Sequence, residues 1–347
     1  MSTIQTNAII DASGGNTATV NGVTPNSDSL KGKNLFKNGD FQVWQRGTSL
    51  THTADKYLAD QWKVTPPGTA NTTSAQVFDT TLQQNTLKIT INQAGYIQFQ
   101  QAIEGFKWAH NKAITISFYA KADTNMRCTF NKRLYHAGGS PVLTTSPVQN
   151  ITTTLTKFTV TFNADDLSGY TEDASSRLQI GWTVNSPSNG NLAAGNDFYI
   201  GQAKAEIGDV ATAFESRSYG EELALCQRYF YQYPRNGGTL APKVTYFSGS
   251  AYAVVFLPAM RALPTITDLA TGTSTGNNVR LYALDGDNIS SSTNENSAPI
   301  FSSSGLPEAP LLIIKWTGLS KPTGVENCPG SVSYNGTSPG IQVSAEY

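Results

Sequence analysis

The stretch RLQIGWTV at residues 177–184 alternates polar and large apolar side chains, with a period of two. Five further runs share this period: LKITINQ (87–93), YIQFQQAI (96–103), AITISFYAKA (113–122), KFTVTFNA (157–164) and DFYIGQAKAEIG (197–208). Such alternation predicts β-strands with one buried face, and the intervals are filled by Asn, Gly, Asp, Ser and Pro, the usual turn residues. The sequence therefore predicts a β-sandwich over residues 34–216.

Segments of different character lie on both sides of this sandwich. Residues 1–33 hold too little apolar surface to fold alone, so they form either a disordered tail or an attachment segment that orders against another protein. Alternation resumes after the linker YPRNGG and continues through residues 235–347, which predicts a second, C-terminal β domain. Within it, Asp285–Asn288 reads as a hairpin turn.

A change of period between the two β domains predicts a connecting helix at residues 217–234. Ser218 and Glu221 form a capping box, and Pro234 is expected to end the helix about four turns later. Its apolar stripe is made by Leu223, Cys226 and Phe230. This stripe has two readings: it caps the sandwich, or it meets two further copies of the chain at a three-fold axis.

Composition excludes several classes of function. Lys and Arg number 24 against 25 Asp and Glu, so there is no basic field to attract nucleic acid. No apolar run is long enough for membrane insertion, and no secretory signal is recognisable, so we expect assembly in a cytoplasm. The three cysteines lack metal-ligand spacing and are expected to be buried apolar residues; they are Cys128, Cys226 and Cys328.

Catalytic motifs are missing from the sequence, and we expect no enzyme. Only three histidines occur, none of them in a nucleophile-elbow or metalloprotease motif. Acidic residues cluster in NADDLSGYTEDAS at residues 163–175, where a solvated turn is the expected explanation. A glycan depolymerase that used this loop is the least favoured alternative.

Sugar binding requires only aromatic rings for stacking and polar side chains for the hydroxyl groups. One group of candidates lies beside a Gly-Gly turn in NKRLYHAGG, where an exposed loop is expected: Arg133, Tyr135 and His136. A second group lies at a turn of the C-terminal domain: Tyr282, Asp285 and Asp287. The tryptophans Trp44, Trp62, Trp108 and Trp182 are candidates for stacking on a sugar, and for Trp44, Trp62 and Trp182 burial in the core is the favoured reading.

Several motifs resemble those of phage and prophage tail-fibre proteins that carry a carbohydrate-binding-type jelly roll and a C-terminal β head. The entrance motifs are NLFKNGDFQVWQRGTS (34–49) and ADKYLADQWKV (54–64), and AITISFYAKAD looks like a central strand. The exit motif is GQAKAEIGDVATAFESRSYGEELALCQRYFYQY (201–233). The entering and closing strands of the family's β head are resembled by AVVFLPAMRALPTIT (253–267) and YNGTSPGIQVSAEY (334–347). The leader IIDASGGNTATVNGVTPN (9–26) is similar to the segment ahead of such modules.

This resemblance implies an all-β protein: an extended N-terminal attachment segment, a jelly roll, a short helix and a second β-sandwich. It implies a virion location in the phage tail, a homotrimer, attachment to other tail proteins through residues 1–33, and adsorption to host cell-surface polysaccharide. An alternative is a tail or baseplate component whose jelly roll docks neighbouring virion proteins.

No metal or cofactor is expected. Jelly rolls of this kind often hold a structural calcium through acidic residues of the last strand, where this chain has Gly201 and Gln202. Asp40 and Asp197 remain, but two carboxylates are few for a cation that prefers six to eight oxygen ligands.

Overall fold

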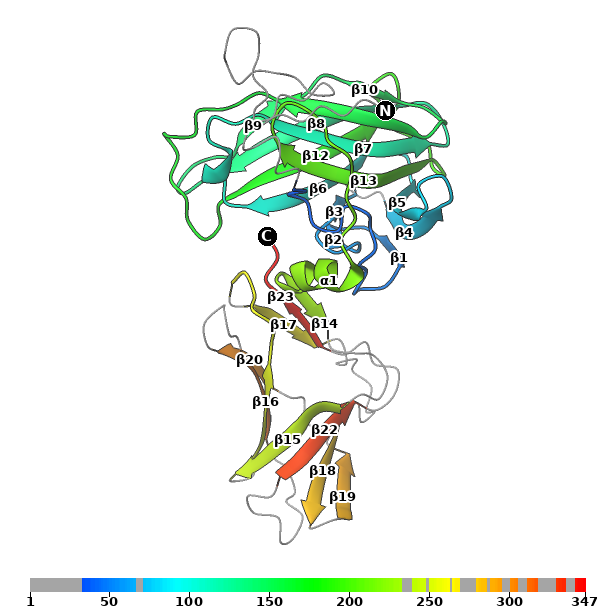
Figure 1. The fold of residues 1–347 in the computed structure, drawn as a ribbon. Helices are drawn as coiled ribbons and strands as arrows, with labels where there is room; N and C mark the ends of the chain where they lie inside the picture. Colours follow the sequence, from blue (N-terminus) through cyan, green and yellow to red (C-terminus); the bar gives the residue numbers. More distant parts are fainter. Residues whose placement is uncertain are drawn as a thin grey trace, which may run out of the picture. The chain divides into compact units, whose positions relative to one another are not determined.

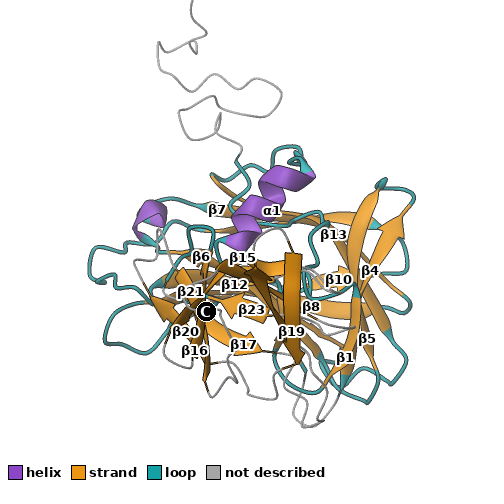
Figure 2. Cartoon of the chain, turned by 90° about the horizontal axis from the view of Figure 1, so that it is seen from below, coloured by secondary structure: helices purple, strands orange, loops and turns teal. Residues whose placement is uncertain are grey.

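The computed structural model describes residues 33–66, 71–232, 239–247, 250–262, 264–268, 279–285, 288–294, 300–304, 311–317, 329–334 and 341–347. It is nearly all β, as predicted, and strands dominate the described part of the chain (Figures 1 and 2). The chain divides into two compact units, Met1–Glu222 and Leu223–Tyr347. The predicted attachment segment at residues 1–33 lies, except for Lys33, outside the described residues.

The first unit is a jelly-roll sandwich of two antiparallel sheets. One sheet has the order β1 (Ser49–His52), β4 (Thr72–Asp79), β5 (Gln84–Ile91), β13 (Asp197–Ile207), β7 (Ile114–Ala122) and β11 (Thr156–Phe162). The other has the order β10 (Gln149–Ile151), β8 (Met126–Tyr135), β12 (Arg177–Asn185), β6 (Ile97–Glu104), β3 (Lys63–Thr65) and β2 (Lys56–Tyr57), and β9 (Val142–Thr145) pairs with β8. A short 3-10 helix, η1, spans Lys107–Ala109.

An aromatic cluster fills the space between these sheets. Trp62 and Trp182 are 0% and 1% exposed, and the Trp182 ring stacks on Phe99 with a centroid distance of 5.0 Å. Trp44 is also buried, and Trp108 is half-buried against the same core. The core prediction is therefore confirmed for Trp44, Trp62 and Trp182. Alternation in β12 turns Trp182 inward, whereas Trp44 and Trp62 lie outside the strands, in the entrance motifs.

The second unit contains two antiparallel sheets. The smaller has the order β14 (Phe230–Gln232), β23 (Ile341–Ser344) and β17 (Thr265–Asp268). The larger has the order β19 (Asn288–Asn294), β18 (Val279–Asp285), β22 (Pro329–Tyr334), β15 (Thr239–Phe247), β16 (Ser250–Phe256), β21 (Leu311–Thr317) and β20 (Ile300–Ser304). Asp285 pairs with Asn288 between β18 and β19, which confirms the predicted hairpin.

The helix α1 (Tyr219–Gln227) is shorter than the 217–234 predicted. Its capping box is confirmed, since Glu221 accepts the backbone N–H of Ser218 at 3.0 Å and the Ser218 hydroxyl oxygen accepts the backbone N–H of Glu221 at 3.4 Å. The predicted end at Pro234 is wrong because Phe230 already lies in β14, which pairs with β23 more than a hundred residues away. Among the described residues, the helices are too short to span a bilayer.

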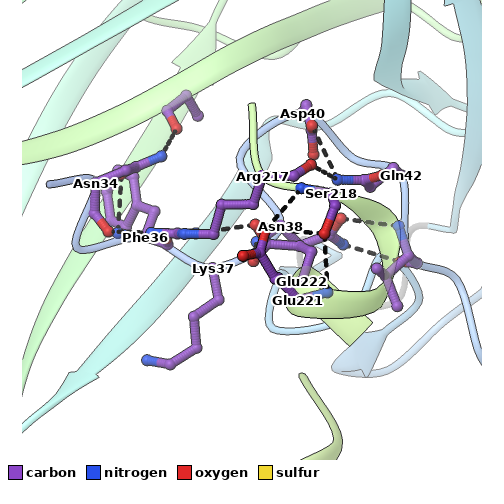
Figure 3. A network of polar contacts seen from close by, with 12 residues as sticks. Asn34, Phe36, Lys37, Asn38, Asp40, Gln42, Arg217, Ser218, Glu221 and Glu222 are labelled. Atoms are coloured by element: carbon purple, nitrogen blue, oxygen red, sulfur yellow. Dashed lines mark hydrogen bonds and ion pairs between the residues drawn. The ribbon is translucent and has the colours of Figure 1, made fainter. Parts of the chain in front are cut away.

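Arg217 ties the entrance of the sandwich to its exit (Figure 3). Its guanidinium donates to the carbonyl oxygens of Asn34 (2.6 Å) and Phe36 (3.3 Å) and forms an ion pair with Glu222 (2.9 Å). Glu222 is 2% exposed and also accepts the backbone N–H of Asn38 (2.5 Å). Hydrogen bonds that involve a charged group are the stronger kind, so this contact fixes the first residues of the unit against the start of α1.

Asn38 completes this arrangement in the left-handed backbone region, with φ 54°. Its side-chain amide donates to the carbonyls of Val43 (2.8 Å) and Asp60 (3.0 Å) and accepts the N–H of Val43 (2.9 Å). We call Asn34, Asn38, Arg217 and Glu222 the entrance–exit clamp. The entrance–exit clamp explains the polar residues of the entrance and exit motifs, because these residues bind each other and the backbone.

Candidate functional site

The outer face of β6, β12 and β8 carries a set of amides in the middle of the seven-stranded sheet (Figure 1). Alternation turns Phe99, Phe130 and Trp182 into the core and leaves the polar neighbours outside. We call this outward set the amide face; it consists of Gln98, Gln100, Asn131, Arg133, Gln179 and Thr183.

Gly181 lies at the centre of this face, with Gln100 opposite on β6 and Asn131 opposite on β8. A Cβ at this position would approach the nearest atom, the Cβ of Gln100, only to 3.6 Å, which is ordinary van der Waals contact. Packing therefore does not require a glycine here. Its missing side chain leaves a shallow hollow of about 70 Å³ that the amides surround.

Contacts within the amide face are few and mostly long. Gln179 donates to the side-chain oxygen of Gln100 at 2.7 Å, while the amides of Gln98 and Asn131 both approach the Thr183 hydroxyl at 3.4 Å. A primary amide offers two N–H donors and an oxygen with two lone pairs. The Asn131 oxygen also accepts the Thr145 hydroxyl at 3.2 Å. Gln98, with one long contact, and Asn131, with two, keep capacity for further hydrogen bonds to a ligand.

The structure brings two of the three predicted residues of NKRLYHAGG together. Arg133 lies on the amide face and donates to the Tyr135 hydroxyl at 3.4 Å, and the Arg177 guanidinium lies 3.7 Å from the centre of the Tyr135 ring. His136 instead packs on Tyr170, with ring centroids 4.7 Å apart. A cation over an aromatic face is favourable, so the Tyr135 ring is held in place by Arg177.

The predicted residues of the C-terminal domain belong to the other unit. Tyr282 and Asp285 lie on β18, where Tyr282 pairs with Ser292 and Asp285 with Asn288. Asp287 lies outside the described residues. That part of the prediction stays a prediction.

Sequence reasoning missed the amides, which lie on three strands. A signal was present in YIQFQQAI, where Gln98 and Gln100 occupy the outward positions of a strand, and in the isolated Gly181 of RLQIGWTV. A glycine inside a strand often marks close approach of a ligand or a backbone. The sequence could not show that these positions share one face, because strand pairing was unknown.

The two carboxylates considered for calcium have other partners. Asp197 binds Lys88 at 2.7 Å and Thr90 at 2.5 Å, and Asp40 accepts the Gln42 amide at 3.1 Å. A Cβ at Gly201 would lie 2.9 Å from the side chains of Leu82 and Thr86, so no carboxylate fits there without rearrangement. Among the described residues, no three His, Cys, Asp or Glu side chains gather as a metal site.

The acidic loop at residues 163–175 is tied into local structure. Glu172 accepts the backbone N–H groups of Phe106 (2.5 Å) and Lys107 (2.8 Å) at the start of η1, and Asp165 pairs with Lys132 at 2.5 Å. Asp173 accepts from Ser175, and these hydrogen bonds hold the pKa of Asp173 below its usual value. The carboxylates of the 163–175 loop therefore order the loop itself.

No protein-family model matches the sequence, and no curated protein matches it. Among solved structures, an enzymatically active domain of tailspike protein 4 of bacteriophage CBA120 aligns at 16% identity and a TM-score of 0.34, over 50% of this chain and 21% of that one. TmCBM61 in complex with β-1,4-galactotriose aligns at 11% identity and a TM-score of 0.31, over 50% of this chain and 99% of that one.

A family 11 carbohydrate-binding module of Clostridium thermocellum aligns at 13% identity and a TM-score of 0.30, over 48% of this chain and 97% of that one. The chain therefore matches about a fifth of the tailspike structure but nearly the whole of these two binding modules. Structural similarity at TM-scores of 0.30–0.34 does not indicate a function for this chain. The assignment of the sandwich rests on the strand order of the chain itself.

Proposed function

We propose that the first unit binds a host cell-surface glycan through the amide face, and that the protein is a trimeric phage tail fibre that contributes to adsorption. The amide face carries this proposal. Its amides and Arg133 surround a hollow at Gly181. Because these side chains make few hydrogen bonds with one another, donors and acceptors are left for a ligand.

A glycan suits this surface better than an apolar ligand does. Sugar hydroxyls both donate and accept hydrogen bonds, as primary amides do, and the Tyr135 ring at the end of β8 offers an apolar face for a pyranose. The surface is a broad sheet face, so it fits a chain of sugar units that lies across β6, β12 and β8.

The tail-fibre part of the proposal rests on the entrance and exit motifs of the sequence. It includes assembly as a homotrimer, virion location, and attachment to other tail proteins through residues 1–33. Light scattering of the purified protein should give the mass of three chains of 37.2 kDa each. A monomer mass would contradict the trimer but would leave the amide face untouched.

A glycan array tests the amide face with a double variant, Gln100→Ala/Asn131→Ala. Each side chain is half-buried, so the variant should fold, and the loss of several hydrogen bonds should weaken binding at least about tenfold. Thr159→Ala is the matched control, since Thr159 is exposed on β11 in the other sheet. Equal binding by the double variant and the parent would contradict the proposal, and release of reducing sugar would indicate a depolymerase.

A further inference from the structure

A larger cavity, of about 370 Å³, lies on the side of β8 and β9 that faces away from the amide face. Register places Lys132 opposite Thr144 and Leu134 opposite Val142, so these four side chains share the inner face of the β8–β9 pair. The 163–170 loop covers that face and completes the cavity with Asp165 and Tyr170. A volume of this size lies in the range of small-molecule sites, roughly 300–1,000 Å³.

The lining of this cavity combines apolar walls with polar side chains. Leu134 and Tyr170 form walls, and Val142 is 40% exposed at the rim. Contact with the His136 ring holds the Tyr170 ring in place, at a centroid distance of 4.7 Å. Such walls suit the C–H faces of a sugar ring.

Lys132 supplies a buried polar group, with a side chain only 5% exposed. Its ammonium donates to Asp165 (2.5 Å) and to the carbonyl oxygen of Asn163 (3.4 Å). The ammonium also lies 5.3 Å from the centre of the Phe162 ring, and the Thr144 hydroxyl lines the same cavity.

The charge of the cavity selects against an anion. Lys132 carries one positive charge, whereas Asp165 and Asp166 carry two negative charges, which leaves a net charge of −1 from the charged residues that line it. The Nδ1 of His110, which lies 3.6 Å from Asp166, accepts the backbone N–H of Leu167 at 3.0 Å. A carboxylated sugar would therefore be repelled, and a neutral one would not.

We propose that this cavity is a second carbohydrate site, which binds one neutral pyranose unit. Its ring would pack between Leu134, Val142 and Tyr170, and its hydroxyls would bind Thr144 and Asp165. This inference goes beyond the proposed function, because the two sites use opposite faces of β8 and neither needs the other.

Saturation-transfer NMR of the full-length protein tests the site with methyl glycosides of glucose, galactose, mannose and N-acetylglucosamine, and with methyl glucuronoside. At least one neutral glycoside should bind, and Thr144→Val should weaken it about fivefold through loss of one hydrogen bond. Thr145→Val is the matched control, since Thr145 bonds Asn131 on the other face at 3.2 Å. Gln100→Ala/Asn131→Ala should keep this binding.

Three outcomes would overturn the inference: no neutral glycoside binds, Thr144→Val binds like the parent, or glucuronoside binds as well as glucoside. Loss of pyranoside binding in Gln100→Ala/Asn131→Ala but not in Thr144→Val would assign the ligand to the amide face instead.

A charge variant tests the ligand class. Asp165→Asn/Asp166→Asn changes the local charge from −1 to +1 and should admit glucuronoside, while it keeps the size of both side chains. If melting shows that this variant is unfolded, Asp166→Asn alone gives the same direction of change, because Asp166 has a side chain 72% exposed. Unchanged exclusion of glucuronoside in a folded variant would contradict the charge argument.

Discussion

The entrance–exit clamp and the amide face are both polar regions of the first unit, yet their polar groups are used differently. In the clamp, Asn38 is 0% exposed and binds backbone groups three times at 2.8–3.0 Å. On the amide face, Gln98 and Asn131 are half-buried and approach Thr183 only at 3.4 Å. The same amide chemistry therefore serves structure in one place and is open to a ligand in the other.

Burial explains this difference. A buried amide without partners would cost about 1–3 kcal/mol, so the clamp must satisfy its own groups. An amide at a surface keeps water as a partner and can exchange it for a sugar hydroxyl. Changes in the clamp should thus be felt as loss of stability, and changes on the amide face as loss of binding.

The largest effect is expected for Asn38→Ala. It removes three buried hydrogen bonds, takes the side-chain partner from the N–H of Val43 and from the carbonyl of Asp60, and places an alanine at φ 54°. We expect the free energy of unfolding to fall by about 4 kcal/mol. Urea denaturation measures it, and a loss below about 1 kcal/mol would show that the clamp is not a structural tie.

Asp60, which lies beside the clamp, should make stability depend on pH. Burial raises its pKa from 3.8 to about 6, against the opposing charge of Arg46, and burial followed by the charge of Glu222 also raises the pKa of Asp40. Between pH 4 and 6 the folded chain holds a proton that the unfolded chain has lost. The free energy of unfolding should therefore fall as pH rises, by about 3 kcal/mol for Asp60.

Urea denaturation at several pH values measures this slope. The variant Asp60→Asn should flatten it, because it removes the titrating group and keeps the shape of the side chain. A stability that rises between pH 4 and 6 would contradict the assignment of a raised pKa.

Glu222→Gln should have an intermediate effect. It keeps an oxygen for the N–H of Asn38 but removes the charge that pairs with Arg217 at 2.9 Å. We expect a loss of about 2 kcal/mol on thermal or urea unfolding, because one partner of a largely buried ion pair is left. Glu221→Gln is the matched control on the exposed side of the same helix turn, and equal losses in both variants would refute a special role for Glu222.

The smallest effect on stability is expected for Gly181→Ala at the centre of the amide face. Its new Cβ meets nothing closer than 3.6 Å, so the free energy of unfolding should change by less than about 0.5 kcal/mol. The methyl group should nevertheless occupy part of the hollow and weaken binding on the glycan array severalfold. Unchanged binding would place the glycan elsewhere on the sandwich.

Prediction from sequence succeeded where a local pattern decides the structure. Alternation located β5, β6, β7, β11, β12 and β13 but missed β4 and β8. The Ser218–Glu221 capping box began the helix, and the Asp285–Asn288 turn formed a hairpin. The helix end failed because β14 gains its hydrogen bonds from β23, a distant strand that a local reading cannot see.

The sequence by itself determined which side chains leave the core, because a strand repeats every two residues and polar groups must face water. Arg133 and Tyr135 were also expected on a surface, but in an exposed loop; that expectation of a loop is wrong, because both residues lie in the strand β8. Only the tertiary structure decided their neighbours, since the pairing of β12 with β6 and β8 places Gln100 and Asn131 on either side of Gly181. Register between strands depends on contacts made after the chain has folded back on itself, so the amide face exists only in the assembled sheet.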